Sequence, residues 1–232
     1  MRLDKFICHS TGLSRQATQR AVRAGAVLVN GVLVKKADHK VMASDVVKLD
    51  GETIVLPGFR YIMLNKPSGY ICANRDGEHP VVLDLLREDS VGDLQIAGRL
   101  DLDTTGLVLI TNDGDWNHRV TAPSRLCCKT YCVTLSEPLS PVAAEQLRAG
   151  VLLTGEKKLT QPATLSFIDN DLAQVRLSIH EGKYHQVKRM FAAVGNHVAA
   201  LHRESIGDIT LDPALLPGQY RALTEREIAS IR

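Results

Sequence analysis

Residues 97–114 read AGRLDLDTTGLVLITNDG, and this stretch decides the fold of the 232-residue chain. A polar loop with two carboxylates, two threonine hydroxyls and a glycine runs directly into the buried-type strand 107–111. Loops held at the end of a rigid strand are favoured places for active sites. In an extended segment Asp101 and Asp103 share a face, because side chains alternate. The residues alone leave a second interpretation open, a turn in which Asp and Thr make local backbone hydrogen bonds.

Outward from this stretch, apolar and alternating runs predict strands at 61–66, 129–135 and 172–179. Residues 112–114, Asn-Asp-Gly, are typical of a turn. Helices are predicted at 81–86, 141–150 and 185–195, the last two each ending at a glycine. The connections between strands are often too short for parallel crossovers. We therefore expect an α+β fold, a mainly antiparallel mixed sheet with helices packed on it.

The first 58 residues have boundaries of their own. Two short helices are predicted, the second beginning after Ser14 as N-cap and ending at Gly25. Asn30-Gly31 between apolar runs predicts a β-hairpin, because both turn residues tolerate positive φ. A further strand ends near Gly51, and Pro57-Gly58 is a candidate linker. We expect two domains, residues 1–58 and 60–232.

Charge is unevenly distributed between these segments. Residues 1–58 hold nine Lys or Arg against five Asp or Glu, whereas the whole chain carries a net charge of only +2. On the second helix, Ala17, Ala21 and Ala24 form one predicted packing face. A second face presents guanidinium groups, which bind phosphate in a bidentate way. A solvated charged surface explains the same pattern. The guanidinium groups belong to Arg15, Arg20 and Arg23.

Residues 2–51 resemble the small RNA-binding domain named after ribosomal protein S-four. The resemblance lies in RLDKF at 2–6, in Ser14-Arg15, in the run from Arg23 to Val27 and in the turn at 29–31. A domain of this kind implies RNA as the partner of the basic helix.

The rest of the chain resembles the pseudouridine synthases, most closely the RsuA branch. Matching stretches follow one another in the family's order: NKPSG at 65–69, GRLDLDTTGLVLITNDG at 98–114, KTY at 129–131, EGKYHQVKRM at 181–190, and the tail LHRESIG at 201–207 with LPGQYRAL at 216–223. The resemblance implies isomerisation of uridine to pseudouridine without a cofactor. The branch implies one uridine of 16S ribosomal RNA in the small subunit.

The same resemblance implies roles for single residues. Asp101 falls on the catalytic aspartate, and Tyr131 on the ring that stacks on a flipped-out base. The aspartate either attacks C1′ or removes a proton at C2′. A cation at position 188 is expected to pair with it, and Lys188 stands where many members have Arg, which leaves open whether Lys188 or Arg189 forms the pair. Contacts to RNA are expected from Arg99, Arg189 and Lys66.

The sequence gives no support for several other classes of protein: disulfide-rich, metal-binding, cofactor-dependent, membrane-spanning or secreted. The five cysteines show no paired C-x-x-C spacing, and no histidine pair has such a companion, so we expect neither a disulfide framework nor a metal site. No dinucleotide or Walker motif is present, and we expect no cofactor. No apolar run approaches the ~20 residues of a membrane span, and no secretory signal begins the chain. We expect a monomer in the cytoplasm.

Two rival interpretations deserve a test. Asp101-x-Asp103-x-Thr105 also fits D-x-D-x-T, the motif of metal-dependent phosphatases of the haloacid dehalogenase type. That family places the motif directly after a buried strand, whereas the preceding QIAGRL is mixed and contains Gly and Arg, and the buried-type strand follows the motif. The chain is alternatively a non-catalytic RNA-binding factor for ribosome assembly. The presence of Asp101, Tyr131 and Lys188 together argues against this second rival.

Overall fold

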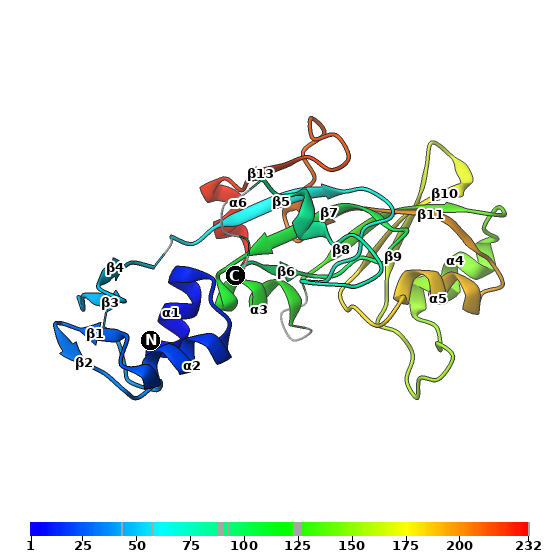
Figure 1. Cartoon of the computed structure of the whole chain (residues 1–232). Helices are drawn as coiled ribbons and strands as arrows, with labels where there is room; N and C mark the ends of the chain where they lie inside the picture. The colour runs from blue at the N-terminus through cyan, green and yellow to red at the C-terminus, as the bar shows by residue number, and fades with distance from the viewer. Residues whose placement is uncertain (43, 57, 88–90, 92, 123–126, 232) are drawn as a thin grey trace. The chain divides into compact units, whose positions relative to one another are not determined.

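The computed structural model describes residues 1–42, 44–56, 58–87, 91, 93–122 and 127–231, so the candidate linker residue Pro57 lies outside it. The chain divides into two compact units, one of residues Met1–Phe59 with Arg87–Leu94 and the other of Arg60–Leu86 with Gln95–Arg232 (Figure 1). Within the described part of the chain, none of the helices combines the length and apolar character that crossing a bilayer requires.

The first unit joins two helices to a small antiparallel sheet of strand order β2-β1-β3-β4. Ser14 caps the second helix as predicted, because its Oγ accepts a hydrogen bond from Ala17 N at 3.2 Å. The Asn30-Gly31 hairpin is also confirmed, with φ of 52° and 79° at the two turn residues. The elements are α1 (Leu3–Thr11), α2 (Arg15–Ala24), β1 (Val27–Val29), β2 (Val32–Leu33), β3 (Val47–Leu49) and β4 (Glu52–Ile54).

Helix α2 packs through a different face from the one predicted. Thr18 and Val22 are fully buried, whereas Ala17 and Ala21 lie at the margin of the core and Ala24 is exposed. Val22 removes more apolar area from water than any of the alanines, so the helix turns its i, i+4 pair 18 and 22 inward. The arginines predicted to meet RNA remain exposed: Arg15, Arg20 and Arg23.

The second unit is built on a sheet of order β13-β5-β7-β11-β8-β10-β9, with β6 added to β7 and β12 to β11. Only β7 and β11 pair in parallel among the described strands, so the predicted mainly antiparallel α+β architecture is confirmed. The strands are β5 (Tyr61–Lys66), β6 (Gln95–Ala97), β7 (Thr105–Thr111), β8 (Lys129–Leu135), β9 (Thr164–Ile168), β10 (Asp171–Ile179), β11 (Val198–Ile206), β12 (Ile209–Thr210) and β13 (Tyr220–Ala222).

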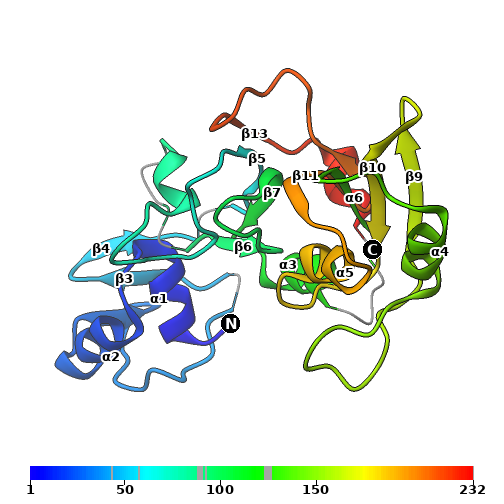
Figure 2. The same cartoon turned by 90° about the vertical axis from the view of Figure 1, so that its right-hand side faces the viewer.

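Helices cover parts of this sheet (Figure 2). Helix α3 lies against β6 and β7, α4 against β9, and α5 against β11. The helices of the second unit are the 3-10 helix η1 (Val82–Leu85) and the α-helices α3 (Gly114–Thr121), α4 (Pro141–Ala149), α5 (Gln186–Ala193) and α6 (Glu225–Ser230).

Strand β7 fixes the loop that carries Asp101. Residues 107–110 are fully buried, as the LVLIT run predicts. At Gly106, φ is 102°, and an added Cβ would lie 2.4 Å from the carbonyl oxygen of Arg203 on the parallel neighbour β11. Any larger residue would push the strands apart, so Gly106 permits the close approach at the strand's beginning.

The predicted turn at residues 112–114 is instead the start of α3. The Asp113 side chain accepts hydrogen bonds from Asp115 N at 3.0 Å and Trp116 N at 3.1 Å. Trp116 is fully buried and donates from Nε1 to the carbonyl of Ile228. A cap of this kind and a turn use the same residue types, and only the buried tryptophan distinguishes them.

Candidate active site

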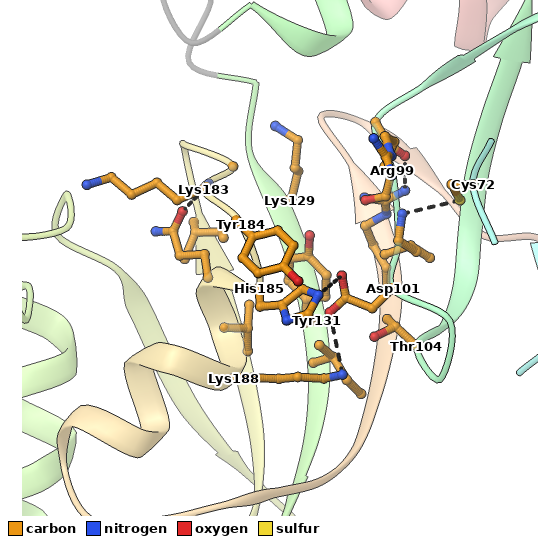
Figure 3. A pocket seen from close by; sticks show the side chains of 18 of the residues that line it. Cys72, Arg99, Asp101, Thr104, Lys129, Tyr131, Lys183, Tyr184, His185 and Lys188 are labelled. Carbon is orange, nitrogen blue, oxygen red and sulfur yellow. Dashed lines mark hydrogen bonds and ion pairs between the residues drawn. The ribbon is translucent and has the colours of Figure 1, made fainter. Parts of the chain in front are cut away.

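A cavity of about 790 Å³ opens on the second unit, lined by the loop before β7, by β8 and by residues 179–188. Three of the predicted site residues, Asp101, Tyr131 and Lys188, line it together, and Arg99 stands at it as well. In Figure 3, Lys188 and His185 reach toward Asp101, whereas Lys183 points away from it. Lys66 and Arg189 are absent from the lining.

Lys188, and not Arg189, pairs with Asp101. Lys188 Nζ lies 3.4 Å from Asp101 Oδ2 and 2.5 Å from Asp103 Oδ1. The hydrogen bond from Lys188 lowers the pKa of Asp103 below its usual value. Arg189 instead donates to the carbonyls of Tyr184 at 3.0 Å and Thr154 at 2.6 Å. Of the two cations that the sequence left open, Lys188 is therefore the partner of Asp101, and Asp103 holds its ammonium in place.

His185 is a site residue that the sequence interpretation missed. Its Nε2 lies 3.4 Å from Asp101 Oδ1, on the side of the carboxylate opposite to the Lys188 contact. Its backbone is left-handed, with φ 47° and ψ 36°, at the N-cap position of α5. Such backbone conformations cluster at functional sites when they occur outside glycine. The available signal was its place directly before helix α5, three residues before the adjacent cations Lys188 and Arg189.

Strand β8 presents Tyr131 and Lys129 on one buried face, as its alternation predicts. Tyr131 lies opposite Leu177 on β10 and Arg203 on β11, in the middle of the sheet. Both side chains line the cavity. Burial lowers the pKa of Lys129, whose ammonium donates to the carbonyl of Cys127 at 3.1 Å.

The structure buries Lys66, one of the residues predicted to contact RNA. Its side chain is fully buried, and Nζ donates to the carbonyls of Pro67 at 3.1 Å, Leu102 at 3.1 Å and Thr104 at 2.6 Å. Burial lowers the pKa of Lys66. In this structure the ammonium fixes the backbone that follows Asp101.

Arg203 fixes the same loop from its other side, a role that the tail motif did not reveal. Only 1% of the residue is exposed, and its guanidinium donates to Leu107 O at 2.8 Å and to Gly98 O at 2.8 Å. Buried cations without carboxylate partners are costly unless their donors are satisfied. Lys66 and Arg203 thus donate to backbone carbonyls before and after Asp101 in the sequence. These hydrogen bonds fix the loop that carries Asp101.

The arrangement suits chemistry at a sugar carbon. A carboxylate sits between two cationic or hydrogen-bonding groups, beside an aromatic ring, in a partly buried cavity. Nucleophilic attack or proton removal by a carboxylate needs this setting. Among the described residues, no three His, Cys, Asp or Glu side chains come together as metal ligands.

Comparisons with known proteins agree with this geometry. Residues 60–193 match the model of the RNA pseudouridylate synthase family, and residues 1–47 match the S4 domain. Ribosomal small subunit pseudouridine synthase A of Escherichia coli K12 is 54% identical over 232 residues, the full length of both chains. The same-named protein of Vibrio cholerae is 52% identical over 231 residues, covering 100% of this chain and 99% of that protein.

A solved structure gives the same result. The crystal structure of a pseudouridylate synthase superimposes with a TM-score of 0.73 at 45% identity and covers both chains completely. These matches displace the phosphatase interpretation of the D-x-D-x-T stretch, because they span the motif and the domain around it. The chain belongs to the RNA pseudouridylate synthase family and carries an S4 domain at its N-terminus.

Proposed function

We propose that this protein isomerises one uridine of 16S ribosomal RNA to pseudouridine. The observation that carries the proposal is the carboxylate of Asp101 held by Lys188 in a cavity that also contains Tyr131. Support for the small-subunit substrate comes from the relatives named above, which are more than half identical over the whole chain.

Asp101 is the catalytic residue of this proposal. Isomerisation breaks the bond from C1′ to N1 and forms one from C1′ to C5, so the aspartate acts at C1′ as nucleophile or at C2′ as base. Lys188 keeps positive charge beside it in either case. A base stacked in a helix is out of reach, so the uridine must be flipped into the cavity. Tyr131 offers its ring to the uracil, and exposed Arg99 offers its guanidinium to a neighbouring phosphate.

The first 58 residues serve as the RNA-binding domain in this account, and residues 60–232 as the catalytic domain. The exposed guanidinium groups of α2 support the first assignment, because they belong to side chains outside the hydrophobic core of the first unit. They are Arg15, Arg20 and Arg23. The second assignment rests on the cavity, whose lining comes wholly from residues after 60.

We propose that the chain acts as a monomer. A substrate in ribosomal RNA supports a cytoplasmic location. Arg189 contributes to RNA binding less directly than expected, because both of its terminal nitrogens already donate to loop carbonyls.

The direct test is incubation of the full chain with unmodified 16S and 23S transcripts, followed by mapping of pseudouridine at nucleotide resolution. One modified uridine in 16S RNA and none in 23S RNA is the expected result. Modification confined to 23S RNA would overturn the assigned substrate, and the absence of pseudouridine in both, also within assembly particles, would overturn the activity.

A further inference from the structure

Tyr184 is unlike the other four tyrosines of the chain. Its side chain is 77% exposed, the largest exposed fraction among the large apolar side chains that the structure describes, whereas the others are buried or half-buried. An aromatic ring in water contributes nothing to the core. Exposed aromatic rings at the edge of a cavity are typical of binding surfaces.

The backbone beneath the ring is firmly held. Arg189 donates to Tyr184 O at 3.0 Å and to Thr154 O at 2.6 Å, and Lys183 forms an ion pair with Glu156 at 3.1 Å. These contacts join residues 183–189 to the neighbouring loop at 154–156. The exposure of the ring is therefore a property of an ordered segment, and the ring is presented in a defined place.

One face of the ring is already covered. The Tyr184 and His185 rings stack with centroids 3.8 Å apart and an interplanar angle of 19°. His185 in turn lies 3.4 Å from Asp101. Figure 3 shows Tyr184 beside Asp101 and in front of His185 at the cavity. The stack of two rings thus starts at the catalytic carboxylate and ends on an open aromatic face.

We propose that Tyr184 is a stacking platform for a nucleobase next to the uridine that is modified. The inference rests on the proposed function and extends it to a second base-binding position. When a uridine leaves the stack, its neighbour loses a partner on one side, and a fixed ring at the cavity supplies a replacement. Exposed Arg99 at the same cavity suits the phosphate that links the two nucleotides.

This position is distinct from the pocket of the flipped uracil. Tyr131, the ring proposed for the uracil, is 7% exposed on a central strand, whereas Tyr184 lies on a loop with most of its surface in water. A buried ring suits a base withdrawn from solvent, and an exposed one suits a base that remains in its strand. Stacking is tolerant of base identity, so the platform accepts any of the four bases.

The experiment uses the full chain and a 16S fragment that contains the target, with 2-aminopurine placed before or after the modified uridine. Binding to the native protein is expected to change the fluorescence at one of these two positions. Tyr184→Leu should abolish that change and weaken RNA binding by about 5- to 150-fold, the loss of one stacked base. Tyr184→Phe should behave as the native protein, because it keeps the ring.

Leu216→Ala serves as the matched control, since Leu216 is 63% exposed and lies outside the cavity. Leu216→Ala should match the native protein both in RNA affinity and in single-turnover rate at saturating RNA. Unchanged RNA binding by Tyr184→Leu would overturn the proposal that Tyr184 is a stacking platform. A slower rate with unchanged affinity would overturn it too, because the ring would then act by positioning His185 beside Asp101. Pseudouridine formation by the native protein in the same fragment keeps these outcomes separate from a failure of the proposed function.

Discussion

The ammonium of Lys188 lies 3.4 Å from the carboxylate of Asp101, although the two residues come from α5 and from the loop before β7. Asp103 binds the same ammonium at 2.5 Å and so fixes it beside Asp101. A cation at this distance stabilises negative charge on the carboxylate, because the site is partly shielded from water. The pair therefore places a cation and a carboxylate side by side at the cavity.

Lys188→Gln is expected to lower the single-turnover rate by about 10- to 150-fold, because hydrogen bonds to charged groups contribute roughly 1.5–3 kcal/mol. Arg189→Gln is the neighbouring control. It should cost stability through its lost carbonyl contacts and change the rate much less. A larger rate loss in Arg189→Gln than in Lys188→Gln would reverse the assignment of the pair.

Lys66→Met tests whether the buried ammonium is structural. The change leaves three loop carbonyls without their donor, and we expect the free energy of unfolding to fall by roughly 2–4 kcal/mol in urea titrations. The dependence of RNA affinity on salt should keep its slope. A slope lower by about 0.7–0.9, with native stability, would instead identify a phosphate contact. Lys158→Met, at an exposed lysine, is the control for stability.

Joint replacement of the three exposed α2 arginines, Arg15, Arg20 and Arg23, by Gln should weaken RNA binding and flatten its salt dependence. Up to three phosphate contacts would be lost, which lowers the slope by about two to three. The rate at saturating RNA should stay close to native. Equal affinity and slope in the variant and the native protein would show that α2 is an ordinary solvated helix.

Glu227 gives a prediction for pH. Arg221 donates two hydrogen bonds to it, at 2.8 and 2.9 Å, and lowers its pKa from 4.5 to about 2. Because the folded-state pKa is depressed, the stabilisation is fully present above the unfolded pKa and is lost as pH falls toward 2. Glu227→Gln should therefore lower Tm at pH 7, and the difference from native protein should narrow below about pH 5. A difference independent of pH would refute this linkage.

The sequence predicted most of the second unit because its strands are long and strongly patterned. Lys129 and Tyr131 follow from simple alternation, and the buried run after Gly106 follows from composition. The cap at Asp113 was mistaken for a turn, since both use the same local hydrogen bonds. Here the local signal was ambiguous, and the packing of Trp116 decided the outcome.

Whether a cation of the site is buried or faces the cavity depends on residues far away in the sequence. Lys66 reaches Thr104 across 38 positions and Arg203 reaches Leu107 across 96, so no local pattern distinguishes them from surface cations. Lys188 and Arg189 are adjacent in sequence, yet one faces Asp101 and the other faces a loop carbonyl. Their assignment required the direction in which helix α5 presents each side chain.

Asp101→Asn tests the central claim most directly. The change keeps the shape of the side chain and removes its charge, and Asp103→Asn is the matched control in the same loop. Conversion should be followed as tritium released from C5 of labelled uridine in 16S RNA, under single-turnover conditions. We expect Asp101→Asn to bind RNA with near-native affinity and release none, while Asp103→Asn retains measurable activity. Turnover by Asp101→Asn within about tenfold of native, a barrier change of only ~1.4 kcal/mol, would contradict the account.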